Sequence, residues 1–164
     1  MERKMSRTID ELLNTPYWII DILPKQVPAG GAGQYFAVEQ YLRDTQLSEI
    51  KKKHVNMILK LNCYRDICLD EDGTINPPPE QIADAIYERY VNIVLDDAMI
   101  ISEPEDTHMT VFNPDEELLT LVRELVAGEG MFVWKNEVLQ STTDTPESGR
   151  MAVKEATGSR AALR

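Results

Sequence analysis

The most apolar stretch of the chain covers residues 17–23, which contain a single carboxylate, Asp21. The stretch ends at Pro24, continues through a glycine-containing loop and leads into a segment with helical spacing. A strand that is apolar on both faces has to lie inside a sheet that is covered on both sides. We therefore expect residues 17–23 to form an interior strand around which the other elements are arranged.

The spacing of apolar residues and the end signals predict the remaining elements. Thr8 and Glu11 have the spacing of a capping box at the start of a short helix, which Pro16 ends. Residues 59–69 fit either the end of a helix or a strand, and we place the boundary near Asn62. We expect helices at 34–43, 44–62, 79–95 and, capped by Asn113 and stopped by Gly128, at 114–127; a strand at 63–69; a hairpin of 98–102 and 107–112; and a short strand at 131–134.

These elements place the chain in the α+β class. A chain of 164 residues is about the size of one domain and can bury a core without disulfides or metals. We expect one domain over residues 1–139, with a small mixed or antiparallel sheet covered by about four to five helices. Residues 140–164 are rich in Ser, Thr and Gly, which is typical of a mobile tail or docking segment.

Charge is distributed unevenly along the chain. The net charge is −11, but residues 66–129 alone carry 17 acidic and two basic side chains, a local net charge of −15. Such a region repels phosphate backbones, so we expect no nucleic-acid binding. It can attract a basic protein or a cation, or it can consist of solvated helix faces. The charged N-terminus and the lack of a long apolar run lead us to expect a cytoplasmic protein that does not bind membranes.

The loop after the first strand is the first candidate ligand site. Backbone N–H groups that lead into a helix N-terminus can hold an anion, and the loop is flanked by one acid, one base and an aromatic residue. The pattern is neither a P-loop nor a dinucleotide fingerprint, and a flexible connection explains it with fewer assumptions. The predicted ligand-binding residues are Asp21, Lys25, Gly30, Gly31, Gly33 and Tyr35.

Other chemistry has less support in the sequence. Residues 70–75 match only inner positions of a calcium loop, so a tight turn is expected there. His54 falls on the apolar stripe of its helix and is expected in the core, whereas His108 is expected in an exposed, polar hairpin loop. Cys63 and Cys68 lack metal or redox spacing and are expected to be free, buried thiols. We expect neither a metal nor a cofactor, and no motif identifies catalytic residues.

The sequence therefore favours a non-enzymatic interaction module, whose acidic surface binds a basic protein partner or a second copy of the chain. The alternative is a small-ligand or anion-binding protein, or an enzyme, that uses the glycine-rich loop. A winged-helix arrangement fits less well, because an acid-rich hairpin makes a poor DNA-contacting wing.

Overall fold

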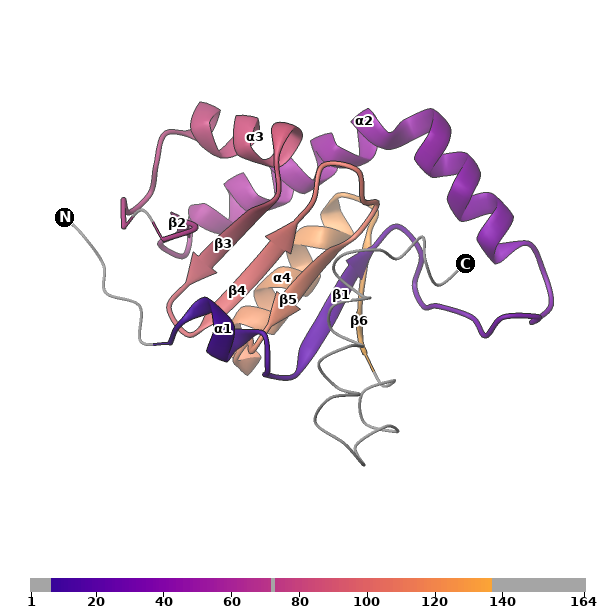
Figure 1. The fold of residues 1–164 in the computed structure, drawn as a ribbon, viewed down its shortest axis with the longest axis horizontal. Coiled ribbons are helices and arrows are strands. Elements are labelled where there is room, and N and C mark those ends of the chain that lie inside the picture. Colours follow the sequence, from indigo (N-terminus) through magenta and orange to yellow (C-terminus); the bar gives the residue numbers. More distant parts are fainter. Residues whose placement is uncertain (1–6, 72, 137–164) are drawn as a thin grey trace.

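The computed structural model describes residues 7–71 and 73–136, which form four helices and one six-stranded sheet (Figure 1). The helices are α1 (Ile9–Leu12), α2 (Tyr35–Asn62), α3 (Pro79–Glu88) and α4 (Glu116–Gly128). The strands are β1 (Tyr17–Asp21), β2 (Cys68–Leu69), β3 (Val91–Leu95), β4 (Ala98–Ser102), β5 (Met109–Phe112) and β6 (Phe132–Lys135). The predicted α+β class is confirmed, but the sheet is larger than the small sheet that we expected.

Strand β1 lies inside the sheet, as its apolar sequence predicts. The strands follow the order β2-β3-β4-β5-β1-β6, and all neighbouring strands run antiparallel. Strands β3, β4 and β5 follow one another in sequence and in space, whereas β1 inserts between β5 and β6. Its residue Ile19 therefore lies opposite Thr110 on one side and Trp134 on the other.

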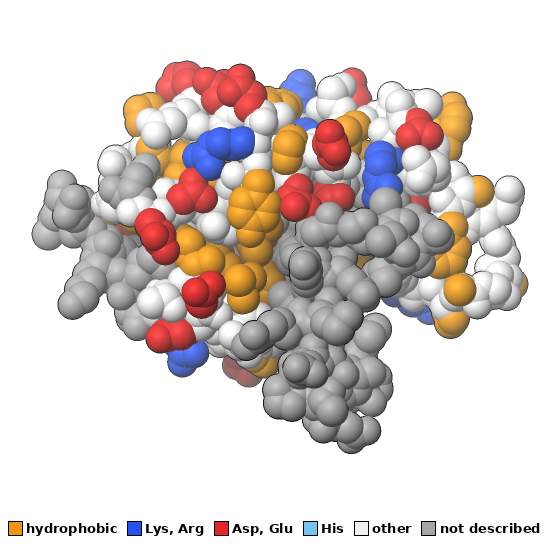
Figure 2. All heavy atoms as spheres, viewed as in Figure 1, with side chains coloured by type: hydrophobic (Ala, Val, Ile, Leu, Met, Phe, Trp, Pro, Cys, Tyr) orange, Lys and Arg blue, Asp and Glu red, His pale blue; other side chains and the backbone are white. Residues whose placement is uncertain are grey.

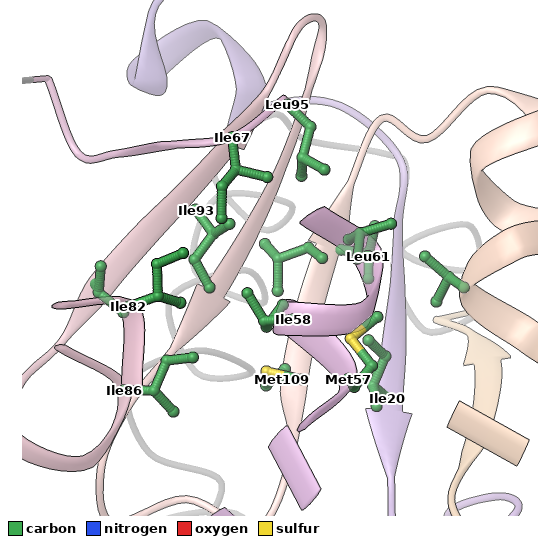
Figure 3. Packing of buried hydrophobic residues seen from close by; sticks show 14 of the residues in the cluster. Ile20, Met57, Ile58, Leu61, Ile67, Ile82, Ile86, Ile93, Leu95 and Met109 are labelled. Atoms are coloured by element: carbon green, nitrogen blue, oxygen red, sulfur yellow. The ribbon is translucent and has the colours of Figure 1, made fainter. Parts of the chain in front are cut away.

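Helices α2, α3 and α4 cover one face of the sheet, and the short α1 lies on the other face (Figure 1). Side chains alternate between the two faces along each strand, so they divide into two buried clusters. The cluster beneath the three helices includes Ile20, Met57, Ile58, Ile93 and Met109 (Figure 3). The cluster on the opposite face joins α1 to the sheet through Leu12, Tyr17, Ile19, Met99, Ile101 and Phe112.

The predicted capping box at the start of α1 is present. Thr8 Oγ1 accepts a hydrogen bond from Glu11 N at 3.1 Å, and Glu11 Oε2 accepts one from Thr8 N at 3.2 Å. These two bonds satisfy backbone donors that a helix N-terminus leaves without a partner in the helix. The helix is only four residues long. Pro16 disfavours helical geometry at the residue before it, so the chain leaves the helix before β1 begins.

Helix α2 bends at Gln46, whose φ of −131° and ψ of 20° are not helical. The sequence predicts two helices that meet at Asp44 or Thr45, so the bend lies next to the expected boundary. Before the bend, Glu39 is the single buried side chain of the helix. After the bend, the buried side chains recur at helical spacing: Ile50, Lys51, His54, Val55, Met57, Ile58 and Leu61.

Strand β3 corrects the predicted helix at residues 79–95. Helix α3 ends at Glu88, and Val91–Leu95 form a strand in which all five residues are buried. A short apolar run rich in β-branched residues fits a fully buried strand as well as a buried helix, and periodicity alone does not separate them. The added strand is one reason why the sheet is larger than expected.

Three smaller predictions are also corrected. Strand β2 covers only Cys68–Leu69 instead of residues 63–69. Cys63 is exposed rather than buried, while Cys68 is buried, and neither forms a disulfide. His108 is 3% exposed and therefore is not part of an exposed hairpin loop.

The predicted tail at residues 140–164 lies outside the described residues, so its boundary with the domain stays a prediction. Among the described helices, none is both long enough and apolar enough to cross a membrane.

Candidate functional site

The residues that the sequence proposes as a ligand site differ in their exposure to solvent. Asp21 is fully buried at the end of β1, where its Oδ1 accepts a hydrogen bond from Ile22 N at 2.8 Å. Lys25 and the glycines are exposed, and the partly buried Tyr35 is the first residue of α2. Burial of the acid and exposure of the base place these groups in different environments.

The backbone of the glycine loop contains a hydrogen-bonded turn. Gly30 and Gly33 have φ values of 82° and 88°, which favour glycine. Gly31 N donates to Pro28 O at 3.0 Å and closes a turn between them. None of the six predicted residues lines either of two hollows that lie elsewhere among the described residues. Ligand binding at this loop stays a prediction.

Those two hollows lie at another part of the molecule and adjoin at Arg65. One is formed by the β3–β4 turn and the start of α4, and the other lies between the end of α2 and α4. Each encloses about 490 Å³. Together they form what we call the acidic groove, defined by Tyr64, Arg65, Leu95, Asp96, Asp97, Ala98, Asn113, Pro114, Asp115, Glu117, Leu118, Thr120, Leu121 and Glu124.

A tight turn and a helix cap shape the groove. Asp96 and Asp97 form the two-residue turn between β3 and β4, in which Asp96 has a φ of 49°. Asn113, which has a φ of 56°, donates from Nδ2 to Asp97 O at 2.8 Å and so holds this turn beside the entry to α4. Asp115, rather than the predicted Asn113, caps α4, and its Oδ1 accepts a hydrogen bond from Leu118 N at 2.7 Å.

Arg65 is the one basic side chain among the lining residues of the acidic groove. Its Nη2 lies 3.7 Å from Asp115 Oδ1 and 3.9 Å from Glu117 Oε2. These separations are longer than charge-assisted hydrogen bonds, and both carboxylates are largely exposed to solvent. Arg65 therefore offsets only part of the negative charge, because exposed ion pairs of this kind interact weakly.

Acidic side chains are not confined to the groove. Figure 2 shows several separate acidic groups on one face of the molecule, and one of them lies over α3. Lysine and arginine side chains lie between these groups (Figure 2). The acidic groove therefore combines acidic side chains with a concave shape.

A second polar cluster lies at the far end of the sheet, where the loop between β4 and β5 meets α2. We call it the Lys51 junction and define it by Lys51, His54, Ser102, Glu103, Asp106 and His108. Lys51 is 2% exposed, and its Nζ donates to Ser102 Oγ at 3.1 Å and to Glu103 O at 2.7 Å. A lysine is rarely buried unless its amine is paired, and these two hydrogen bonds supply the partners.

Burial shifts the titration of several groups in the Lys51 junction. It lowers the pKa of Lys51 to about 8, although the carboxylates of Asp106 and Glu103 act in the opposite direction. It holds the pKa of His54 well below 6.5, and the neighbouring Lys51 and His108 lower it further. Burial and a hydrogen bond with Asp106 raise the pKa of Glu103 to about 8. The junction therefore contains groups that can change charge near neutral pH.

Neither of these two regions is predicted from the sequence. The sequence does contain a signal for the groove, because Asp96 and Asp97 separate two apolar strands and α4 begins with acidic residues. This signal can be read only when β3 is recognised as a strand. Lys51 lies three residues before His54, so it shares the helical stripe that predicts burial of the histidine. A lysine on such a stripe is the signal for a buried amine.

Neither region has the donor set of a metal site, since the described residues contain no group of three or more His, Cys, Asp or Glu arranged to hold a metal ion. Comparisons with protein-family models, curated proteins and solved structures give no match for this chain.

Proposed function

We propose that this chain is a non-enzymatic interaction module that binds a basic protein segment in the acidic groove. The observation that supports the proposal is the pair of adjoining hollows, which carry five carboxylates against one guanidinium. The carboxylates belong to Asp96, Asp97, Asp115, Glu117 and Glu124.

Electrostatics favours a cationic occupant. Carboxylates around a concave surface reinforce one another's potential, which attracts cations and raises the rate of association. An arginine from a partner can approach Asp115 and Glu117 more closely than Arg65 does, and it can bind a carboxylate through two parallel hydrogen bonds. Binding of this kind weakens as salt screens the charges.

The groove also offers apolar contacts. Tyr64 is 69% exposed at its edge, and the partly buried Leu121 and the buried Leu118 lie in its walls. Exposed tyrosine is common at protein interfaces, where it contributes apolar area together with a hydroxyl group. A segment that combines arginine or lysine with aliphatic side chains therefore fits better than a free metal ion.

The lining residues do not supply an activated nucleophile. They include neither histidine nor cysteine, and the hydroxyl of Thr120 donates within its own helix to Glu116 O at 2.9 Å. Nucleophilic catalysis requires a base within hydrogen-bonding reach of the nucleophile. This composition supports binding rather than catalysis.

Titration calorimetry with a synthetic peptide of alternating arginine and leucine tests the proposal, at low and at high salt. The groove variant Asp97→Asn/Glu117→Gln/Glu124→Gln should weaken binding about tenfold, since each exposed pair contributes about 0.5 kcal/mol. The matched control Glu80→Gln/Asp84→Asn/Glu88→Gln removes the same charge from α3 and should retain most of the affinity.

Equal weakening in both variants would show that only net charge matters and would contradict a specific groove. Affinity that is independent of salt would also contradict the proposal.

A second copy of the chain is another source of the basic segment. Light scattering of the protein alone tests this, because self-association through the groove should disappear in the groove variant and persist in the α3 variant.

A further inference from the structure

The chain leaves its last described strand at the same end of the sheet as the acidic groove. Asn136, which follows β6, donates from its backbone N to Tyr17 O at 3.2 Å. Asn113, which follows β5, donates from its backbone N to Pro16 O at 3.0 Å. The two asparagines therefore flank the start of β1, and two strand spacings, about 10 Å, separate them. Because Asn113 also lines the groove, the chain beyond Asn136 starts close to the groove.

The sequence beyond Asn136 divides into an acidic part and a basic part, both outside the described residues. Residues 137–149 contain three acidic side chains and no basic one, a net charge of −3. Residues 150–164, which we call the basic segment, contain four basic side chains and one acidic one, a net charge of +3. The groove has five carboxylates and one guanidinium, a net charge of −4. Opposite charges favour the basic segment as its occupant.

The basic segment also contains apolar residues at a spacing that suits the groove. Residues 150–154 and residues 160–164 each have three apolar residues between two basic ones. The walls of the groove likewise combine carboxylates with the apolar side chains of Leu118, Leu121 and Tyr64. Both kinds of contact are therefore available to the same short segment.

The connection is long enough for the basic segment to reach the groove of its own chain. Residues 137–149 span up to about 40 Å when fully extended, at about 3.3 Å per residue. That length exceeds the separation of about 10 Å between Asn136 and the start of the groove. A tethered segment also has an effective concentration in the millimolar range, so it competes well even when its intrinsic affinity is modest.

The other basic runs of the chain fit the groove less well. Lys51, Lys52 and Lys53 are fixed on α2, where Lys51 is buried. Residues 1–7 contain three basic side chains and one acidic one, but methionine is their only apolar residue type. The basic segment is the run that combines positive charge with several aliphatic side chains.

We propose that the basic segment occupies the acidic groove of its own chain and competes there with a basic partner. This inference rests on the proposed function, because it takes the groove as the binding site and adds the regulation of that site. A partner binds only molecules in which the segment has left the groove, so the segment lowers the apparent affinity for the partner.

A spin label on a native cysteine tests the position of the segment. Cys63 is exposed and Cys68 is buried, so a nitroxide reagent attaches at Cys63, next to the groove residue Tyr64. In the full-length wild-type protein at low salt, the amide NMR signals of residues 150–164 should lose intensity, and reduction of the nitroxide should restore it. The groove variant should show little loss, whereas the α3 variant should show the wild-type loss.

An absence of signal loss in the wild-type protein, or equal loss in the groove variant, would overturn the proposal. A mixture of spin-labelled protein with isotope-labelled protein that carries no nitroxide separates the two possible sources of the segment. Full signal loss in this mixture would assign the segment to a second copy and overturn binding within one chain. Signal loss confined to the protein that carries both labels supports the proposal.

Calorimetry with the arginine–leucine peptide tests the competition. Neutralising the segment should raise the affinity for the peptide about fivefold, because the tethered competitor is weakened. The segment variant is Lys154→Gln/Arg160→Gln/Arg164→Gln. The matched control, Lys25→Gln/Lys52→Gln/Lys53→Gln, lowers the net charge by the same three units at residues outside the groove and should change the affinity much less.

The two variants also distinguish this inference from the proposed function. Equal peptide affinities in the segment and control variants, with binding that still depends on the groove carboxylates, would overturn the inference and leave the proposed function intact. Peptide binding that does not depend on those carboxylates, even in the segment variant, would overturn both.

Discussion

Lys51 Nζ lies 2.7 Å from the backbone oxygen of Glu103, and this contact joins positions 52 residues apart in the chain. The amine is almost completely buried, yet its carboxylate neighbours are on a loop rather than on another helix. A short, buried hydrogen bond to a charged donor is stronger than a neutral one, but removing the amine from water opposes its charged form. The contact therefore makes stability depend on pH.

Replacing the buried amine should change stability at alkaline pH. In the wild-type protein the pKa of Lys51 is about 8, whereas in the unfolded chain it is 10.5, so the unfolded state binds more protons between these values. Wild-type stability should gain up to about 3 kcal/mol from this group as the pH rises from 8 to 10.5. Lys51→Met should lack the gain, while the exposed neighbour substitution Lys52→Met should keep it. Urea unfolding across this range measures the difference, and parallel curves for wild type and Lys51→Met would contradict it.

Removing the basic side chain from the acidic groove should strengthen peptide binding. Arg65→Ala leaves Asp115 and Glu117 without their intramolecular cation and should raise affinity for the arginine–leucine peptide about threefold. Arg89→Ala is the matched control, because Arg89 pairs with Asp70 at 2.7 Å away from the groove. Calorimetry at low salt compares the two variants. A larger increase in Arg89→Ala would show that the effect is not local.

The cap of α4 should be required for stability. Asp115→Ala removes the acceptor for Leu118 N and should lower the free energy of unfolding by about 1 kcal/mol. Asp115→Asn keeps a capping oxygen and should be nearly neutral. Thermal unfolding of both variants distinguishes loss of the cap from loss of charge. Equal destabilisation by the two substitutions would mean that the charge, and not the hydrogen bond, is what matters.

Two glycines with open space around them should respond in opposite ways to alanine. An added Cβ meets nothing within 4 Å at either Gly33 or Gly128. Gly33 has a φ of 88°, so Gly33→Ala should destabilise the chain by about 1–2 kcal/mol. Gly128 ends α4 without a positive φ, so Gly128→Ala should stabilise it by about 0.5 kcal/mol. Chemical unfolding tests both signs, and a neutral Gly33→Ala would indicate that the loop relaxes freely.

Local patterns account for the parts of the fold that could be predicted. The capping box of Thr8 and Glu11 marks α1, and the apolar run at β1 marks an interior strand, because each signal depends on neighbouring residues. The β4–β5 hairpin likewise follows from two apolar runs with a polar loop between them. Strand β3 was missed because residues buried on both faces carry no period that separates strand from helix.

The candidate sites were less predictable because they depend on contacts between distant residues. The sequence predicts an exposed His108 because its loop is assumed to face solvent. In the structure that loop is bonded to α2 through Lys51 and Glu103, and His108 is buried. Arg65 and Asp115 meet only after α2 and α4 have packed on the sheet. Neither local propensity nor charge counting contains that information.

The bend at Gln46 divides α2 into two parts that bury different numbers of side chains. The first part, residues 35–45, is too short to be stable as an isolated helix in water and buries one side chain, Glu39. The second part is held by a row of buried aliphatic residues. The first turns of α2 can therefore melt and re-form while the sheet stays intact, so amide protection along this helix should rise in a step near Gln46.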